Sequence, residues 1–472
     1  MAAVLEAAID EQSPPLPSRA PSVRRRVLTL AAPVIGENLL QTIIGIVDTL
    51  FVSRLGADAL AGVGTAVQAM FFLISALSAV VIGSSILVAH AIGARDHERA
   101  SRVARQAVIW SILLALPLSA LGWFFAGTIA VAFGTTPAVA GIAAAYLRVA
   151  FGTVMVLVLA FSCSAVLRGA GDTRTPLVAT LIANVINAVA AWALIFGHLG
   201  LPALGANGSA WAATMGRTVS AALLVALLFR GRSGIRLSGL AGWWPRRSAA
   251  RDILRLGIPA AVEQLLITAA FTALTILVAR LGTDALAASR VVGNAMSVSL
   301  LPGFGFAIAA TTLVGQSFGA GKPEAGRAAA LEALRWALVW MGAAGVLYFV
   351  AGNAIVRAFS ADPAVLRIGV ASLHSMALFQ PVWALGIVLS GALRGGGDTR
   401  FPLLINASGI WASVLLAWLI IGRFGGGLPQ AWLCFAVVAP LGSLAIWLRF
   451  RNQDWQRATR LTTTDFSAGS VG

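Results

Sequence analysis

Reactive and metal-binding side chains are scarce in this chain of 472 residues. Its two cysteines, Cys163 and Cys434, lie far apart, and no pair among its four histidines has metal-ligand spacing. Both cysteines fall inside predicted apolar helices, where we expect them to pack as small hydrophobic residues. The sequence therefore argues against a disulfide framework, and neither a metal centre nor an organic cofactor is predicted.

Enzyme signatures are also missing. The segment GQSFGAGKPEAG at 315–326 contains a Gly-Lys pair, but Gln316 stands where a phosphate-binding loop requires glycine. Pro323 stands where Ser or Thr would bind magnesium. Neither GxSxG nor HExxH occurs, which removes the usual hydrolase motifs. The chain is therefore not predicted to be an enzyme.

Charge is scarce as well: 11% of the residues are charged and 58% are hydrophobic, which is typical of a membrane protein. Continuous apolar runs long enough to cross a hydrocarbon core of about 30 Å recur along the chain. Strands of a membrane barrel would alternate instead, so an all-α integral membrane protein with twelve transmembrane helices is predicted. The expected spans are 26–53, 64–90, 104–131, 138–166, 175–198, 205–229, 252–280, 291–317, 328–357, 364–392, 401–422 and 428–449.

The positive net charge of +16 follows from where the basic residues lie. The two tails and the even-numbered predicted loops hold 26 of the 34 basic residues, and the odd-numbered loops hold six. By the positive-inside rule, both termini are expected in the cytosol, with the basic loops against anionic lipid headgroups of the cell's inner (plasma) membrane. Nucleic-acid binding is not predicted. Residues 1–24, which lack the pattern of a signal peptide, and 451–472 are expected to be disordered cytosolic tails.

The second half of the chain repeats the first at a shift of 226 positions. LRGAGDTRTP at 167–176 returns as LRGGGDTRFP at 393–402, and residues 33–61 match 259–287 with 14 identities in 29. Near the last helix pair the register changes, and Trp211 aligns with Trp432 at a shift of 221. The chain is therefore a tandem of two related units.

Six spans in each unit return the chain to the same side of the membrane, so the units are parallel repeats related by an axis along the membrane normal. We predict an N-lobe at 25–230 and a C-lobe at 252–450, joined by a cytosolic inter-lobe loop at 231–251. A cleft between two such lobes, open to alternate sides, is typical of a transporter.

Each decapeptide falls in the predicted cytosolic turn between the fourth and fifth spans of its lobe. Its glycines permit a tight turn, and Asp172 and Asp398 are placed to cap the next helix. One interpretation is a capped turn in which Arg168 and Arg394 fix topology, and the other is a gating contact between the lobes. The candidate gating or hinge residues are Pro33, Pro259, Arg168, Asp172, Arg394 and Asp398.

The chain resembles the multidrug and toxic compound extrusion (MATE) family over about residues 25–450. The residues that carry the resemblance are P…VDTLFVSRLGADALAGVG from Pro33 to Gly64, its partner P…ARLGTDALA at 259–287, and the paired LRGxGDTRxP loops. The resemblance implies a V-shaped pair of six-helix lobes. It also implies a secondary active multidrug efflux antiporter, expected to be a monomer, which exports small organic, often cationic, compounds in exchange for H⁺ or Na⁺.

Ionisable groups inside predicted spans are candidates for the ion chemistry, because a charge at the bilayer centre costs about 2.5–3.5 kcal/mol on insertion scales. Their spacing puts Glu37, Gln41 and Asp48 on one stripe of the first helix, which we expect to face the lobe interior. The full ionisable set is Glu37, Asp48, Arg148, Arg217, Glu263 and His374.

Asp48 is the strongest single candidate, because it matches the cation-coupling carboxylate that the MATE family carries in its VDT motif. The equivalent residue of the second repeat is Leu274, which indicates a site in the N-lobe alone. The resemblance further implies that Asn184, Asn187 and Thr214 supply oxygens to this site. For the asparagines, packing between helices is an equal interpretation.

Glu263 resembles a C-lobe glutamate used by several branches of the family, and Glu37 is its counterpart in the first repeat. Because both are present, the two glutamates are either cation-coupling residues or packing devices for the first helix of each lobe. Ala191 stands where some prokaryotic relatives carry an Asp, which leaves the N-lobe set one carboxylate short.

The sequence leaves alternatives open for the substrate and for the function. A flippase for a lipid-linked precursor would need several basic residues in the cleft, whereas Arg148 and Arg217 are the two inside the spans. A receptor or scaffold would not need parallel repeats with an asymmetric buried acid. The candidate residues of the substrate cleft are Gln41, Gln68, Gln380 and Trp383.

Overall fold

The computed structural model describes residues 22–239, 242–452 and 455, and over these ranges the chain forms helices and no strand. The first half holds α2 (Val23–Ser53), α3 (Ala57–Gly93), α4 (His97–Phe124), α5 (Ala126–Ala132), α6 (Pro137–Gly152), α7 (Val154–Ala170), α8 (Arg174–Phe196), α9 (Ala206–Phe229) and the short η1 (Arg232–Gly234). The second half holds α10 (Arg247–Ala279), α11 (Thr283–Gly319), α12 (Pro323–Arg357), α13 (Pro363–Ala377), α14 (Gln380–Gly395), α15 (Arg400–Phe424) and α16 (Leu428–Arg451). The predicted tails lie largely outside the described residues.

Ten of these helices are long and apolar enough to cross a membrane. The pairs α6 with α7 and α13 with α14 each add one bent span, so by length and composition the described chain has twelve spans, as the sequence predicted. The prediction of continuous helices over 138–166 and 364–392 is wrong, because these two pairs bend by 54° and 52°. The predicted span 104–131 also divides, at Phe125, into α4 and α5.

Local chemistry explains the two bends. Between α6 and α7, the hydroxyl of Thr153 donates over 2.9 Å to the carbonyl of Val149, which also accepts the backbone N–H of Thr153, and such bonds often bend helices. Between α13 and α14, Pro381 in the first turn of α14 has no N–H with which to continue the preceding helix. Both bends fall inside otherwise apolar runs, which is why hydropathy alone does not reveal them.

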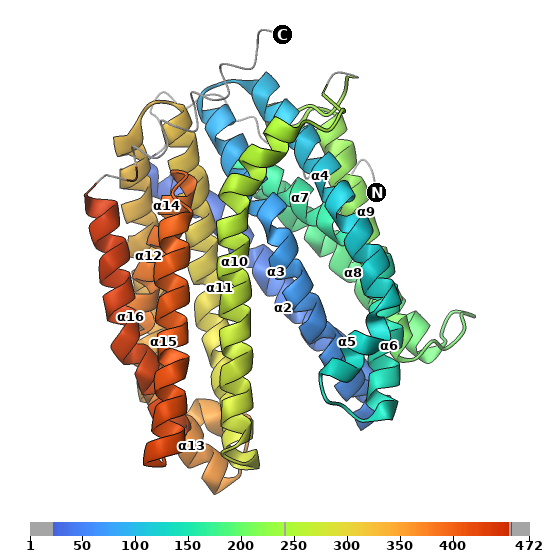
Figure 1. The fold of residues 1–472 in the computed structure, drawn as a ribbon, viewed down its shortest axis with the longest axis vertical. Coiled ribbons are helices and arrows are strands. Elements are labelled where there is room, and N and C mark those ends of the chain that lie inside the picture. The colour runs from blue at the N-terminus through green and yellow to red at the C-terminus, as the bar shows by residue number, and fades with distance from the viewer. Residues whose placement is uncertain (1–21, 240–241, 453–454, 456–472) are drawn as a thin grey trace.

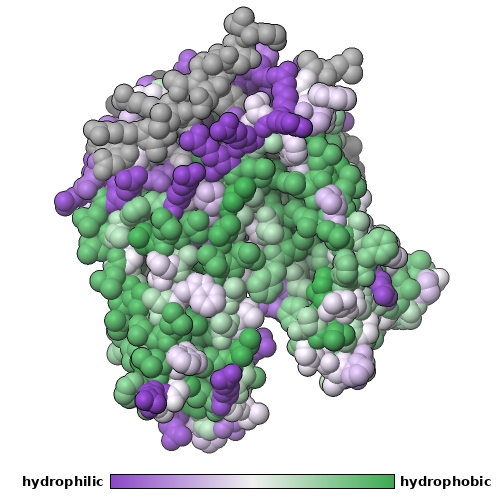
Figure 2. Space-filling view, in the orientation of Figure 1, coloured by the Kyte–Doolittle hydropathy of each residue, from purple (hydrophilic) through white to green (hydrophobic). Residues whose placement is uncertain are grey.

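The helices form two lobes that diverge toward one end of the molecule and meet at the other (Figure 1). The N-lobe core includes Leu147 and Ile195, and the C-lobe core includes Leu373 and Phe379. Figure 2 shows a hollow between the lobes where they diverge, hydrophobic side chains around the middle of the surface, and many hydrophilic ones where the lobes meet. We call these two ends the open end and the closed end.

The first helix of each lobe begins against the opposite lobe. Val27 of α2 is buried in one apolar cluster with Phe306 of α11, and Ile253 of α10 is buried in another with Val80 of α3. The crossing of α10 over α3 depends on a glycine, because a β-carbon on Gly257 would overlap the carbonyl of Ala79. We call α2 and α10 the exchanged helices. They join the lobes at the closed end and leave the open end free to separate.

Candidate functional site

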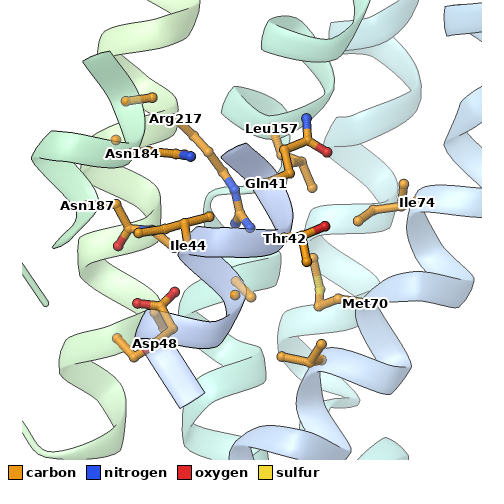
Figure 3. A pocket seen from close by; sticks show the side chains of 18 of the residues that line it. Gln41, Thr42, Ile44, Asp48, Met70, Ile74, Leu157, Asn184, Asn187 and Arg217 are labelled. Carbon is orange, nitrogen blue, oxygen red and sulfur yellow. The ribbon is translucent and has the colours of Figure 1, made fainter. Parts of the chain in front are cut away.

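The N-lobe contains a cavity of about 770 Å³ lined by α2, α3 and α6 to α9, with Leu301 of α11 at its wall. Glu37, Gln41 and Asp48 all line it, which confirms that the polar stripe of α2 faces the lobe interior. Figure 3 shows Asp48 and Gln41 around the same space as Asn187 of α8 and Arg217 of α9. Asp48 is therefore placed where a solute inside the lobe can reach it.

The Asp48 carboxylate has an oxygen without a partner. Within the described part of the chain, its buried Oδ1 makes no hydrogen bond, and the same holds for Oδ1 of the neighbouring Asn187. A buried acceptor without a donor costs about 1–3 kcal/mol. A proton on the carboxylate, or a cation held by both oxygens, would satisfy this arrangement.

The other predicted oxygen donors of the N-lobe are engaged elsewhere. Asn184 lines the cavity, but its amide donates to the carbonyl of Leu40 over 2.6 Å and ties α8 to α2. The hydroxyl of Thr214 lies 3.0 Å from that of Thr153 and so secures α9 at the α6–α7 bend. The structure thus brings Asp48 and Asn187 together and places Thr214 outside the cavity lining.

Glu37 and Glu263 are each paired with the arginine of their own lobe's decapeptide. Nη1 of Arg168 donates to both carboxylate oxygens of Glu37, at 3.1 and 3.0 Å, and Nη2 of Arg394 donates to Oε1 of Glu263 at 2.6 Å. Both glutamates are buried, at 3% and 1% exposure. The repeat therefore places the same ion pair in each lobe, a role for the two arginines that neither interpretation of the sequence named.

A second cavity, of about 450 Å³, lies in the C-lobe and reaches the interface. Glu263, Arg394 and Trp383 line it together with Val81 and Arg168 of the N-lobe. Oε1 of its acid pairs with Arg394, whereas Oε2 is buried without a hydrogen bond in the described part of the chain, so Glu263 differs from Asp48 in having an ion-pair partner.

Two predicted cleft residues serve contacts between helices. Gln68 of α3 donates to the hydroxyl of Thr272 on α10 over 3.0 Å and so joins the two lobes. Gln380 is buried at the start of α14 and accepts a hydrogen bond from Ser299 at 2.6 Å. Neither side chain lines the two cavities described above.

The decapeptide aspartates fasten each loop to segments of its own half of the chain. Asp172 accepts the backbone N–H of Thr175 at 3.0 Å, which caps α8, and pairs with Arg232 at 3.1 Å. Asp398 pairs with Arg449 of α16 at 3.0 Å. Burial by itself would raise the pKa of Asp172, but the hydrogen bonds that its carboxylate accepts outweigh burial and lower that pKa below its ordinary value.

Each decapeptide also contacts the opposite lobe. Nε2 of His90 on α3 lies 2.7 Å from the carbonyl oxygen of Gly395, and Gln316 on α11 donates to the carbonyl of Gly169 over 3.1 Å. His90 and Gln316 are equivalent in the repeat, as are Gly169 and Gly395. We call these four residues the closed-end contact. It is a contact between the lobes of the kind that the gating interpretation requires.

Two residues of these cavities were not singled out as site residues from the sequence. Arg217 was identified only as an ionisable group within a span, yet it lines the N-lobe cavity. Asn406 donates to Glu263 over 2.7 Å. The repeat held the signal for Asn406, because its equivalent is Thr180, whose hydroxyl lies 3.5 Å from Glu37.

Two parallel six-span lobes with internal cavities and one shared closed end define a membrane transporter. The family model MatE matches residues 33–193 and 259–419, two ranges separated by the same 226 positions as the repeat. The chain therefore belongs to the MatE family of multidrug and toxic compound extrusion transporters.

Relatives match over nearly the whole chain. A probable multidrug resistance protein NorM of Thermotoga maritima is 30% identical over 94% of this chain and 95% of its own length. Another, from Burkholderia mallei, is 34% identical over 89% of this chain and 87% of its own length. An uncharacterised transporter, YisQ of Bacillus subtilis, is 25% identical and covers 91% of this chain, with 94% of its own length matched.

Solved structures share the fold. A MOP superfamily transporter from Pyrococcus furiosus, described as having a binding pocket of reverse polarity, superposes with a TM-score of 0.85 at 22% identity, over 91% of this chain and 96% of that one. An outward-facing multidrug resistance MATE family transporter gives 0.84 at 22% identity over the same shares. Both likenesses extend across the two lobes.

Proposed function

We propose that this protein is a secondary active multidrug efflux antiporter of the plasma membrane, which exports organic, often cationic, compounds in exchange for H⁺ or Na⁺. Membership of the family and the names of the relatives support export of small molecules. The basic inter-lobe loop lies at the closed end, so the topology predicted from charge makes this conformation open to the outside.

One observation carries the proposal: among the described residues, one of the two otherwise repeated lobes contains an acid without an ion-pair partner. Asp48 lines the N-lobe cavity with an unsatisfied oxygen, whereas its equivalent, Leu274, is buried in the C-lobe core. Glu37 and Glu263 are paired in both lobes, which suits a structural role. An acid free of a permanent ion-pair partner can exchange a proton, a metal ion and a cationic substrate.

The proposed cycle uses this competition. In the outward-open state, an external H⁺ or Na⁺ binds at Asp48 and removes the negative charge that holds a cationic group, so the substrate leaves. Closure of the open end and separation of the closed-end contact then expose the cavity to the cytosol. There the ion leaves and a new substrate binds the free carboxylate.

The test is efflux of a fluorescent lipophilic cation from proteoliposomes under an imposed pH gradient and, separately, a sodium gradient. We expect one gradient to drive export by the wild type and Asp48→Asn to abolish that export, because an amide binds neither ion as a carboxylate does. Glu263→Asp, which keeps an acid in the C-lobe, is the matched control. If no member of a broad dye panel moves under either gradient while the protein remains folded, the proposal is wrong.

A lipid-linked flippase is less well supported. Such a substrate carries several phosphate charges and would need a cluster of free arginines or lysines. Among the described residues that line the N-lobe cavity, Arg217 is the basic one, and Arg168 nearby is held by Glu37.

A further inference from the structure

The N-lobe cavity contains a positive charge as well as Asp48. Arg217 extends from the middle of α9 into the space around Ile44 (Figure 3). No ion pair or hydrogen bond engages its guanidinium within the described part of the chain, and its attraction to Asp48 acts across the cavity. An arginine inside a membrane-spanning helix is costly, so one without a partner indicates a function.

The charged side chains in and around the N-lobe cavity sum to zero when Asp48 is ionised. Its charged lining residues are Glu37, Asp48 and Arg217, and Arg168 already holds both oxygens of Glu37. What remains is a negative end at Asp48 and a positive end at Arg217. A cavity built only for monovalent cations would carry a net negative charge, whereas this one is neutral with two separated poles when Asp48 is ionised.

The repeat shows that the two poles belong together. Asp48 is replaced by Leu274 in the second repeat, and at the local shift of 221 Arg217 is replaced by Val438. Val438 lines the C-lobe cavity, so it occupies the corresponding wall. Both poles are thus present in the N-lobe cavity and both are absent from the C-lobe cavity, although the rest of the glutamate–arginine framework is duplicated.

Building on the proposed export function, we infer that the N-lobe cavity selects zwitterionic amphiphiles, with Arg217 as the residue that determines this specificity. The carboxylate of the substrate binds the planar guanidinium of Arg217, whose paired donors match carboxylate geometry. The cationic group of the same molecule lies near Asp48. The apolar body packs against the wall that includes Met70, Ile74 and Leu157.

A matched pair of dyes tests the inference: tetramethylrhodamine, which carries a carboxylate and a cationic ring system, and its methyl ester, which keeps only the cation. Fluorescence polarisation measures the binding of each to purified protein. The wild type should bind the carboxylate dye more tightly than the ester. Arg217→Gln should weaken the carboxylate dye about tenfold, a loss of about 1.4 kcal/mol, and should tighten the ester, because repulsion between two cations is removed.

Two further variants separate recognition from folding. Arg217→Lys keeps the charge without the paired donors and should retain part of the preference for the carboxylate dye. Arg148→Gln removes an exposed arginine of α6 that does not line the cavity, and the wild-type preference should remain. The inference is overturned if the wild type prefers the ester, or if Arg217→Gln changes the affinity for both dyes by the same factor.

Transport of the same dyes distinguishes this inference from the proposed function. Export of the ester with no binding of the carboxylate dye would refute zwitterion selection and leave the exporter intact. The expected binding ratio, with neither dye moved by either ion gradient, would refute the exporter and leave the assignment of Arg217 standing.

Discussion

At the scale of single residues, the buried acids fall into two groups: those with an arginine partner and Asp48, which has none among the described residues. Glu37 and Glu263 each pair with an arginine and form the first group. One oxygen of Asp48 and one of Glu263 make no hydrogen bond within the described part of the chain, so the ion pair is what separates the two acids. An acid with a permanent ion-pair partner has little to offer a passing cation, because the arginine must first be displaced. The acid without one is the candidate for exchange.

The Glu37–Arg168 pair should behave as a structural unit. Replacing one partner, as in Glu37→Gln, leaves the other charge buried and should cost about 3 kcal/mol of stability. The double variant Glu37→Gln/Arg168→Gln should recover a large part of this loss. Thermal unfolding of the purified protein in detergent measures both effects, and additive losses in the double variant would show that the two residues do not interact.

Single-residue predictions from the sequence succeeded where a residue's position on a helix was enough. The stripe of Glu37, Gln41 and Asp48 follows from helical periodicity, and it does face the cavity. The partner of Glu37 is 131 positions away, and no local pattern indicates such a contact. The repeat carried a hint, because a glutamate and an arginine recur together at the same shift.

At the scale of elements, each decapeptide loop joins three parts of the molecule. In the N-lobe, Arg168 reaches the first helix and Asp172 holds Arg232 after the last one. The carbonyl of Gly169 meets Gln316 of the opposite lobe. Because one short loop links the cavity wall to the lobe interface, a change at α2 can be transmitted to the closed end. The duplicated sequence serves the same set of contacts twice.

Weakening the closed-end contact should favour its separation. Each of the two hydrogen bonds is worth about 1 kcal/mol, so His90→Ala/Gln316→Ala should raise the separated population about thirtyfold. Spin labels at Ala94→Cys and Ala320→Cys, two exposed positions just after α3 and α11, report the distance between lobes, and the native cysteines are buried.

Thr311, on the same helix as Gln316, provides the control for this experiment. Thr311 donates to Gly391 within its own lobe over 2.8 Å, so Thr311→Val should leave the distribution of distances unchanged. A distribution in the double variant identical to the wild type would contradict a role of the closed-end contact in holding the lobes together.

The loop aspartate predicts a pH dependence of stability. Because the folded-state pKa of Asp172 lies below its ordinary value of 3.8, its ionised form stabilises the fold fully above that value and loses this effect as the pH falls through the lowered pKa. Asp172→Asn should therefore be less stable than the wild type from pH 7 to pH 5, by an amount that shrinks near pH 3. A difference that stays constant down to pH 3, measured by thermal unfolding, would contradict the lowered pKa.

The ends of the helices were largely predictable from the sequence, whereas the bends within the predicted spans were not. Apolar runs end at polar or glycine-rich loops, so spans such as 428–449 agree closely with α16. The bends at Thr153 and Pro381 depend on one hydroxyl or one missing N–H inside an apolar run. Trp455 also stacks on Phe450, so C-lobe packing extends past the boundary predicted at 450.

At the scale of the whole molecule, the parallel repeat determines the architecture. An even number of spans per unit and one conserved shift were enough to predict two parallel lobes, which the family match confirms. The exchange of α2 and α10 between lobes was not predictable, because either lobe offers an apolar surface to their first turns. These exchanged helices hold the closed end, while Asp48 lies further along α2 in the N-lobe cavity.

The most direct test measures the movement of the ion across the membrane while a gradient of substrate drives transport. Proteoliposomes with no ion gradient, loaded with a pH-sensitive or a sodium-sensitive dye, receive a sudden excess of transported substrate on one side. The account predicts that H⁺ or Na⁺ moves in the opposite direction to the substrate in the wild type, and that Asp48→Asn shows no ion movement. Substrate flux without any counter-movement of either ion, or equal ion movement in Asp48→Asn, would contradict coupling through Asp48.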